Sequence, residues 1–424
     1  MSVPIPPEAE RAVGMERYGT ATPGVGGVLR QTPADFRVEE IPRREPRGSG
    51  RYLIVEVEKE NWDTQGLVRA LARALRISRK RISFAGMKDR NAVTVQRMSF
   101  FGVRPAALES VRLAGVRLRA VGLDPEPVGL GDLESNRFSI VLRAIPLPAE
   151  EVRARAEATA AELRYLGGAP NFFGLQRFGE RRAVTHRVGE LLVRGDVEGA
   201  MRAYLADEGE GEGEATRAAR RLAREGDFKG ALAAMPKSLG FEKALLNRLI
   251  AKPDDWGGAL EALPAGLRTL FVHGFQARLF NRVLSERLAR GLSLAEPVAG
   301  DILLLRGGGT ETVAPGNIEA ARRAVAEGRA RVSGPLFGPE APVASGEPGE
   351  IERGVLEGAG IAPEDFARGP VTSKGRRRAL LLPAPVKWEG GPDERSPGCV
   401  ALKLKFSLEP GAYATVVLRE FTKA

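Results

Sequence analysis

The sequence predicts an α+β protein in which one discontinuous domain is interrupted by an inserted domain. The chain has 424 residues, more than a single hydrophobic core usually serves, so we expect two domains. Strand-like alternation marks both ends of the chain, whereas helices rich in Ala, Arg and Leu dominate its middle. Because the C-terminal strands resemble the first segment more than the middle one, we expect the two ends to form one domain.

The first segment mixes strands and helices. Residues 52–58 are strand-like, and apolar side chains at helical spacing follow from Thr64, with Thr64 or Asp63 as N-cap. A basic turn over residues 76–81 leads into a short strand, residues 82–85, which a glycine ends. This order predicts a strand, a helix and a second strand that ends at Gly86.

A second strand pattern covers Arg137–Arg143, where Phe138, Ile140 and Leu142 share one face. A helix follows, and Gly167–Pro170 ends it. We place the first domain boundary at this turn.

The middle of the chain contains several predicted helices, including a long one over Leu267–Arg290. The Glu/Gly run Asp207–Glu214 predicts a solvated loop, which we place away from any RNA surface because it would repel phosphates. Residues 331–350 are rich in Gly and Pro and predict a loop. Near the C-terminus, Val400–Phe406 alternates, and Tyr413–Arg419 is expected to be a further strand.

Composition narrows the chemistry. A single cysteine, Cys399, excludes a disulfide framework, and only two histidines occur, His186 and His273. A zinc site or a Ser–His triad is therefore not expected, and we assign structural roles to all three residues. The reaction is expected to depend on carboxylates, Lys or Arg, with no metal and no cofactor.

Charge and hydropathy indicate the partner and the compartment. The formal net charge of +10 suits a polyanion bound through phosphate contacts, although codon usage or heat adaptation would give a similar composition. No apolar run approaches the roughly 20 residues of a membrane-spanning helix, and the N-terminus lacks the pattern of a secretory signal. We expect a cytoplasmic protein without membrane contact.

One acidic residue stands out after the strand at residues 82–85. Asp89 lies between Lys88 and Arg90 on a loop that leaves a strand end. Neighbouring cations keep a carboxylate ionised, as a nucleophile requires. The residues alone also fit a plain surface turn with a charge cluster, and that alternative stays open here.

The segment Phe84–Gln96 resembles the signature around the catalytic aspartate of the TruD family of tRNA pseudouridine synthases. Further segments resemble family motifs in the same order along the chain: Arg30–Glu40, Ser135–Arg143, Pro170–Gly179, Ala277–Leu284, Arg376–Leu382 and Pro410–Glu420. The resemblance implies the pseudouridine synthase fold, with a mixed, largely antiparallel sheet, plus an inserted second α/β domain, the TRUD domain. It places the discontinuous catalytic domain at residues 1–168 and 381–424, and the insertion at residues 169–380.

The resemblance also implies residue roles. Asp89 is the expected catalytic carboxylate, which attacks C1′ of the ribose or assists proton loss and glycal formation. Gln96 would help to anchor the Asp89 loop, and Arg30 stands where bacterial members usually have Lys. Substrate-binding roles are implied for Phe138, Asn136, Tyr413, Lys88, Arg30 and Phe36, and weaker RNA contacts for Arg90 and Arg177. For Phe138, a core position on the Ile140–Leu142 face is the alternative.

The activity implied by the resemblance is isomerisation of uridine to pseudouridine in tRNA, with uridine 13 of the D arm as target. We expect tRNA as the partner, no obligate protein partner and a monomer. One alternative is a synthase that acts at another tRNA position or on another RNA. The other is a non-catalytic RNA-binding or folding protein, against which an intact Asp89 argues.

Overall fold

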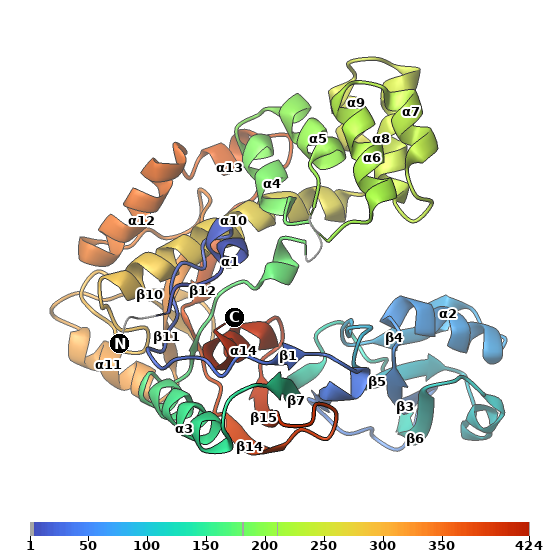
Figure 1. The fold of residues 1–424 in the computed structure, drawn as a ribbon, viewed down its shortest axis with the longest axis horizontal. Helices are drawn as coiled ribbons and strands as arrows, with labels where there is room; N and C mark the ends of the chain where they lie inside the picture. The colour runs from blue at the N-terminus through green and yellow to red at the C-terminus, as the bar shows by residue number, and fades with distance from the viewer. Residues whose placement is uncertain (1–3, 180–181, 210, 424) are drawn as a thin grey trace. The chain divides into compact units, whose positions relative to one another are not determined.

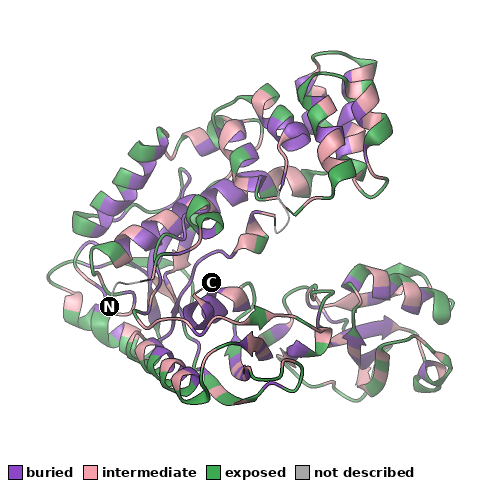
Figure 2. Cartoon of the chain, in the orientation of Figure 1, coloured by how far each residue is buried: buried purple, intermediate pink, exposed green. Residues whose placement is uncertain are grey.

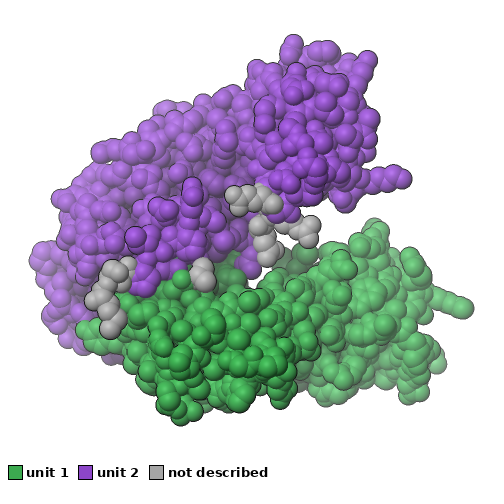
Figure 3. Space-filling model, viewed as in Figure 1, with its two compact units in different colours: residues 1–3, 20–169, 382–424 green, residues 4–19, 170–381 purple. Residues whose placement is uncertain are grey.

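The computed structural model describes residues 4–179, 182–209 and 211–423. These residues form two compact units (Figure 1 and Figure 3). Unit 1 contains residues 20–169 and 382–423, and unit 2 contains residues 4–19 and the described part of 170–381. The short strands β8 (Ala169–Pro170) and β13 (Leu381–Leu382) lie where the chain passes from one unit to the other.

Unit 1 is built on a nine-stranded sheet with the order β14-β15-β7-β2-β5-β3-β6, to which β1 is added beside β7 and β4 beside β5. Its strands are β1 (Val28–Leu29), β2 (Phe36–Pro42), β3 (Tyr52–Glu60), β4 (Ile82–Phe84), β5 (Val93–Phe101), β6 (Val116–Asp124), β7 (Leu133–Ile145), β14 (Lys387–Pro392) and β15 (Val400–Leu408). β2 and β5 pair in parallel, and the other described pairings are antiparallel. The predicted α+β class with a mixed, largely antiparallel sheet is confirmed.

Helices α2 (Thr64–Ala74), α3 (Ala149–Tyr165) and α14 (Ala414–Thr422) accompany this sheet, with 3₁₀ turns at Pro33–Asp35, Arg79–Arg81 and Pro105–Ser110. The Asp63 side chain caps α2, as predicted, by accepting a hydrogen bond from Gly66 N at 2.7 Å. The apolar stripe of α2, which includes Leu67 and Leu71, packs in one core cluster with side chains of β3 and β5. This packing fixes α2 to the sheet.

Helix α14 replaces the strand that we predicted over Tyr413–Arg419. Its Val and Thr residues favour strands, but this preference is weak and tertiary packing overrides it. Most of the helix is buried, and the buried carboxylate of Glu420 accepts hydrogen bonds from Thr20 N (3.0 Å) and Oγ1 (2.9 Å). The contact with a segment 400 residues earlier, invisible to local pattern, holds this segment as a helix.

Unit 2 is mainly helical and carries a four-stranded antiparallel sheet with the order β10-β9-β11-β12. Its helices are α1 (Glu8–Ala12), α4 (Thr185–Val193), α5 (Val197–Ala206), α6 (Glu214–Arg224), α7 (Phe228–Ala234), α8 (Gly240–Ala251), α9 (Trp256–Glu261), α10 (Ala265–Ala289), α11 (Ile318–Ala326), α12 (Gly346–Ala359) and α13 (Asp365–Arg368), with a 3₁₀ turn at Leu175–Arg177. Its strands are β9 (Ile302–Leu305), β10 (Thr310–Thr312), β11 (Ala330–Leu336) and β12 (Arg376–Ala379).

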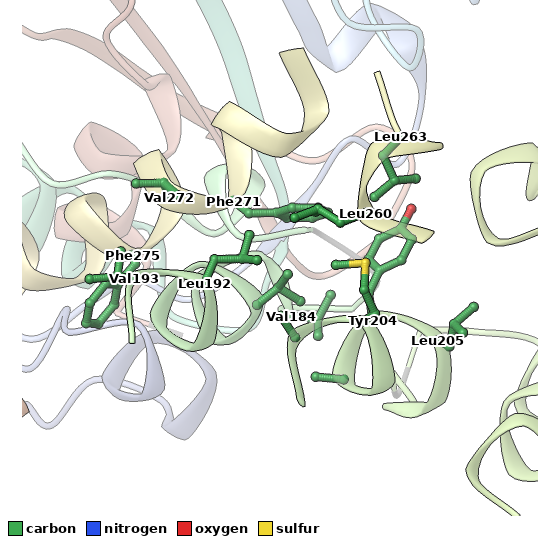
Figure 4. Packing of buried hydrophobic residues seen from close by; sticks show 14 of the residues in the cluster. Val184, Leu192, Val193, Tyr204, Leu205, Leu260, Leu263, Phe271, Val272 and Phe275 are labelled. Atoms are coloured by element: carbon green, nitrogen blue, oxygen red, sulfur yellow. The ribbon is translucent and has the colours of Figure 1, made fainter. Parts of the chain in front are cut away.

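The long helix α10 forms the centre of unit 2 and is buried over much of its length (Figure 2). Phe271, Val272 and Phe275 of α10 pack against Leu192 of α4 and Tyr204 of α5 (Figure 4). The N-terminal segment belongs to this unit too. Asn281 Nδ2 of α10 donates to Val13 O at 3.0 Å, and Ser285 Oγ donates to Gly14 O at 2.8 Å. Residues 4–19 are thus tied to α10 by side-chain hydrogen bonds.

The Gly- and Pro-rich segment at residues 331–350 differs from the predicted loop. It contributes most of β11, which pairs with β9 on one side and β12 on the other, and the start of α12. Gly334 lies in β11 against Phe280 and Leu380, where a larger side chain would meet both. Here the glycine serves close packing within a strand rather than a turn.

Candidate active site

The loop that carries Asp89 joins β4 to β5 in unit 1. Beneath the loop, strands β3 and β5 each direct polar side chains toward the protein interior. Two residues farther from the loop along each strand, the next inward-facing side chain is apolar. On β5, Thr94 and Gln96 are buried and precede Met98 on the same face. On β3, Lys59 is buried and follows Val57. The sheet therefore presents a buried polar floor beneath the loop.

Lys59 holds the backbone of the loop. Its side chain is fully buried, and Nζ donates to Trp62 O at 2.5 Å and Asp89 O at 2.8 Å. Burial lowers the pKa of Lys59 to about 8, although the Asp89 carboxylate nearby opposes this shift. At neutral pH an ammonium group thus binds the main chain of Asp89 from below.

Three further hydrogen bonds fix the loop. Lys88 N donates to Thr64 Oγ1 at 2.9 Å, which joins the loop to the first residue of α2. Gln96 Nε2 donates to Gly86 O at 3.1 Å. Lys88 Nζ lies 2.8 Å from Glu40 Oε2, and both of these side chains are buried. Lys88 is therefore the ion-pair partner of Glu40 on β2, and its ammonium group is committed to the loop's support.

The Asp89 carboxylate itself is half exposed, at 52% of its side-chain surface, and pairs with Arg30. Arg30 Nη2 lies 2.5 Å from Asp89 Oδ2, and the guanidinium group stacks over the Phe36 ring at 4.0 Å from the centroid. Arg30 has a left-handed φ of 56°, an uncommon conformation for a residue other than glycine. The structure thus places two predicted substrate-binding residues, Arg30 and Phe36, next to the predicted catalytic carboxylate.

Phe138 belongs to an aromatic cluster on the same face of the sheet. It lies directly opposite Phe406 of β15, with ring centroids 5.3 Å apart and nearly parallel planes, and meets Phe36 edge-on at 6.2 Å. Only 8% of Phe138 is exposed. The alternation along β7 predicted this inward direction, and the stacking role of Phe138 toward uracil stays a prediction.

Asn136 is one inward position away from Phe138 on β7, opposite Glu40 of β2. Its Oδ1 atom is buried and accepts no hydrogen bond from the described residues. The same holds for Thr94 Oγ1 and Gln96 Oε1 in the polar floor. Buried acceptors normally have partners, so three unpaired oxygens on one face indicate a place where water or a ligand binds.

The remaining predicted residues lie in different places. Tyr413 is half-buried at the start of α14, and Arg90 is exposed in the Asp89 loop. Arg177 belongs to unit 2, where its guanidinium group lies 5.9 Å from the Phe173 ring centroid. His186, predicted to be structural, packs edge-on against Phe178, and burial lowers its pKa to about 4.

Lys59, Glu40 and Thr64 were not among the predicted site residues. For Lys59 the sequence did contain a signal, because it falls on the inward parity of Leu53, Val55 and Val57 in a strand. A lysine at such a position must find acceptors or lose its charge. Its actual acceptors are backbone carbonyls, which no residue pattern identifies.

Comparison with known proteins supports the resemblance to the TruD family. The family model described as "tRNA pseudouridine synthase D (TruD)" matches residues 12–421. A probable tRNA pseudouridine synthase D of Methanococcoides burtonii is 41% identical over 98% of both chains, and that of Methanosarcina mazei is 42% identical over 98% of both.

The structure is similar as well. A crystal structure of a Methanosarcina mazei protein with a tRNA pseudouridine synthase D description matches with a TM-score of 0.90 at 42% identity, covering 100% of this chain and 99% of that one. Among the described residues, no helix is both long and apolar enough to cross a membrane. By family model, sequence identity and fold together, the chain belongs to the TruD family of tRNA pseudouridine synthases.

Proposed function

We propose that this chain converts uridine to pseudouridine in tRNA, with Asp89 as the catalytic carboxylate and uridine 13 of the D arm as the target. The observation that carries the proposal is the Asp89 loop itself. Its main chain is bound by Lys59 and its carboxylate is paired with Arg30, yet half of that side chain is exposed. A rigidly held, ionised and accessible carboxylate is what this reaction requires.

The reaction breaks the C1′–N1 bond, turns the uracil and joins C1′ to C5, while C5 loses its proton to solvent and N1 takes up a proton. The two protons balance, so the product is an isomer of the substrate, and no net electron transfer occurs. Asp89 either attacks C1′ or takes a ribose proton to form a glycal, and both routes need the ionised form. Arg30 pairs with Oδ2, and Oδ1 accepts no hydrogen bond from the described residues.

The base is expected to leave its stack and enter the site, as in other enzymes that act on a nucleobase. Phe36, Phe138 and Phe406 supply an apolar cluster beside Arg30, against which a uracil ring can lie. Asn136 Oδ1 is a buried acceptor that a uracil N–H would satisfy. Tyr413 is proposed as a second aromatic contact.

Substitution of the carboxylate tests the catalytic assignment. We expect Asp89→Asn to lower tritium release from [5-³H]uridine-labelled tRNA by at least about 10³-fold, with tRNA binding retained. Asp132→Asn is a matched control, because Asp132 is a part-buried carboxylate of unit 1 that accepts only from Gly129 N among the described residues. Wild-type turnover in Asp89→Asn would overturn the assignment and favour a non-catalytic RNA-binding protein.

The target position needs a separate experiment. A tRNA transcript with cytidine in place of uridine 13 should release no tritium above background when uridine alone carries the label. Persistent release would place the target at another tRNA position. Mapping pseudouridine in cellular tRNA with and without the gene would then identify it.

A further inference from the structure

We propose that α2 and the turn after it form a phosphate-binding surface for the RNA substrate. This inference rests on the function proposed above and extends it to the route of the RNA backbone. The surface consists of five exposed cations, which we call the α2 basic ridge: Arg69, Arg73, Arg76, Arg79 and Lys80.

The ridge is not neutralised by the protein. None of its five side chains forms an ion pair or hydrogen bond with another described residue. Between residues 61 and 81 the sequence has one acid, Asp63, and this carboxylate caps the helix. By contrast, neighbouring Arg81 is used structurally, since its guanidinium group donates to Phe101 O and Gly102 O.

Helix stability does not account for this charge pattern. Arg69 and Arg73 are four residues apart on α2, so their side chains lie on one face, opposite the buried Leu67 and Leu71, and Arg76 follows the end of the helix with a left-handed φ of 54°. Like charges four residues apart destabilise a helix by about 0.2–0.5 kcal/mol. The helix dipole favours cations only in the last turn, which leaves Arg69 unexplained. An anionic partner accounts for the whole set.

The surface fits RNA better than an acidic protein. Protein interfaces contain an apolar core within a polar rim. None of the large exposed apolar side chains of the described chain lies between residues 61 and 81. The exposed positions between the cations are Ala74 and Ser78, which are small. A row of cations without apolar anchors is suited to a phosphate backbone.

The ridge is joined directly to the proposed catalytic loop. Thr64, the first residue of α2, accepts a hydrogen bond from Lys88 N, the residue before Asp89. At 1.5 Å per residue, Arg69 lies about 7–8 Å along the helix from Thr64, and Arg73 about 6 Å farther. An RNA strand bound to the ridge would therefore be held at a fixed distance from the Asp89 carboxylate, within unit 1.

The test removes charge from the ridge and measures binding to unmodified tRNA over a range of salt concentrations. Arg69→Gln/Arg73→Gln/Arg76→Gln should reduce the slope of log K against log salt by about 2 to 3. Between 50 and 200 mM salt, the wild-type protein would then lose about 16- to 64-fold more affinity than this variant. In turnover assays the effect should fall mainly on KM. Circular dichroism and thermal unfolding check that the variant is folded.

Two matched variants make the outcome decisive. Arg43→Gln/Arg104→Gln/Arg395→Gln removes three exposed, unpaired cations scattered over unit 1, and should change the slope much less. Arg69→Lys/Arg73→Lys/Arg76→Lys keeps the charge and should keep the slope. The proposal is overturned if the ridge variant binds like wild type, if the scattered control loses as much, or if the Lys variant behaves like the Gln variant. Failure of the proposed function would appear separately, as a wild-type protein that binds tRNA but converts no uridine.

Discussion

Helices α2 and α6 are both rich in arginine, but only the arginines of α6 are paired with carboxylates in the described part of the protein. Each of the four arginines of α6 pairs with a carboxylate: Arg217 with Glu214, Arg220 with Glu212, Arg221 with Glu208 and Glu214, and Arg224 with Glu208. No arginine of α2 pairs with a described residue. A net charge of +10 therefore does not show which cations are free to bind an anion, whereas the positions of the carboxylates show which of these arginines are paired within the protein.

The carboxylates around α6 come largely from the Glu/Gly run that we predicted to be a solvated loop. Glu212 is instead 10% exposed at its side chain and binds Arg220, which is 1% exposed. Burial alone would raise the pKa of Glu212, but the hydrogen bonds from Arg220 lower it. Glu210 lies outside the described residues. The run acts, at least through Glu212, as a structural counter-charge for a helix of unit 2.

The largest expected effect comes from substituting Arg220, the buried arginine of α6. Arg220→Met should lower the free energy of unfolding of unit 2 by about 3–5 kcal/mol, because it leaves two little-exposed carboxylates, Glu212 and Glu242, with only Arg182 as a nearby cation. Urea unfolding measures the change. Arg221→Met, at an exposed position, should cost less than about 1 kcal/mol, and equal effects of the two changes would contradict the buried-pair interpretation.

Lys59 provides an intermediate case, a buried cation bound to carbonyl oxygens. Lys59→Met should lower kcat by about 10- to 100-fold, since a loop displaced by about 1 Å misplaces the Asp89 carboxylate, while KM for tRNA changes little. Lys405→Met, at an exposed ion pair on β15, is the control. A KM effect as large as the kcat effect would argue against a positioning role.

The pH dependence of Lys59 gives a second readout. Its folded pKa, about 8, is below the ordinary value of 10.5, so the folded protein binds fewer protons than the unfolded chain between these pH values. The charged form therefore costs stability below pH 8, and this cost is relieved as pH rises from 8 to 10.5. Wild-type stability should rise relative to Lys59→Met across that window, while activity falls because the Lys59 side chain, which holds the Asp89 loop, loses its charge. A pH-independent difference between the two proteins would contradict this.

The smallest predicted effects have opposite signs on the two helices. Arg69→Gln on α2 should raise the free energy of unfolding by about 0.2–0.5 kcal/mol, because it relieves repulsion from Arg73. Arg221→Gln on α6 should lower it by a similar amount, because it loses Glu208 and Glu214. Replicate thermal unfolding can resolve the two changes in the free energy of unfolding. Changes of the same sign would contradict the proposed difference in charge pairing between α2 and α6.

Local sequence patterns correctly predicted the helices and strands that depend mainly on local interactions. The capped helix α2 and the alternating strand β7 formed where spacing and turn chemistry placed them. Helix α14 and strand β11 did not follow their local preferences, because buried partners distant in sequence decide their conformation.

In the candidate site, too, some features follow from the local sequence and others depend on residues distant in the chain. The residue pattern placed Asp89 on a loop after a strand, and the structure has it there. The pairing of Asp89 with Arg30, 59 residues earlier, depends on how β1, β2 and β4 come together around the sheet. Likewise, Lys59 binds main-chain oxygens whose positions exist only once the loop has folded.

The ends of the insertion have a consequence for how the chain acquires its fold during synthesis. Asn171 N donates to Leu380 O at 2.8 Å, so unit 2, once folded, holds its own entrance and exit together. Arg143 on β7 must meet Asp393, 250 residues later, before the sheet of unit 1 is complete. A prefolded insertion shortens that loop to a few tens of residues and saves about 1–2 kcal/mol of closure entropy. The aromatic cluster around Phe138 includes Phe406 of β15, so it can be completed only after β15 has left the ribosome, and a translation product truncated before β15 lacks this part of the site.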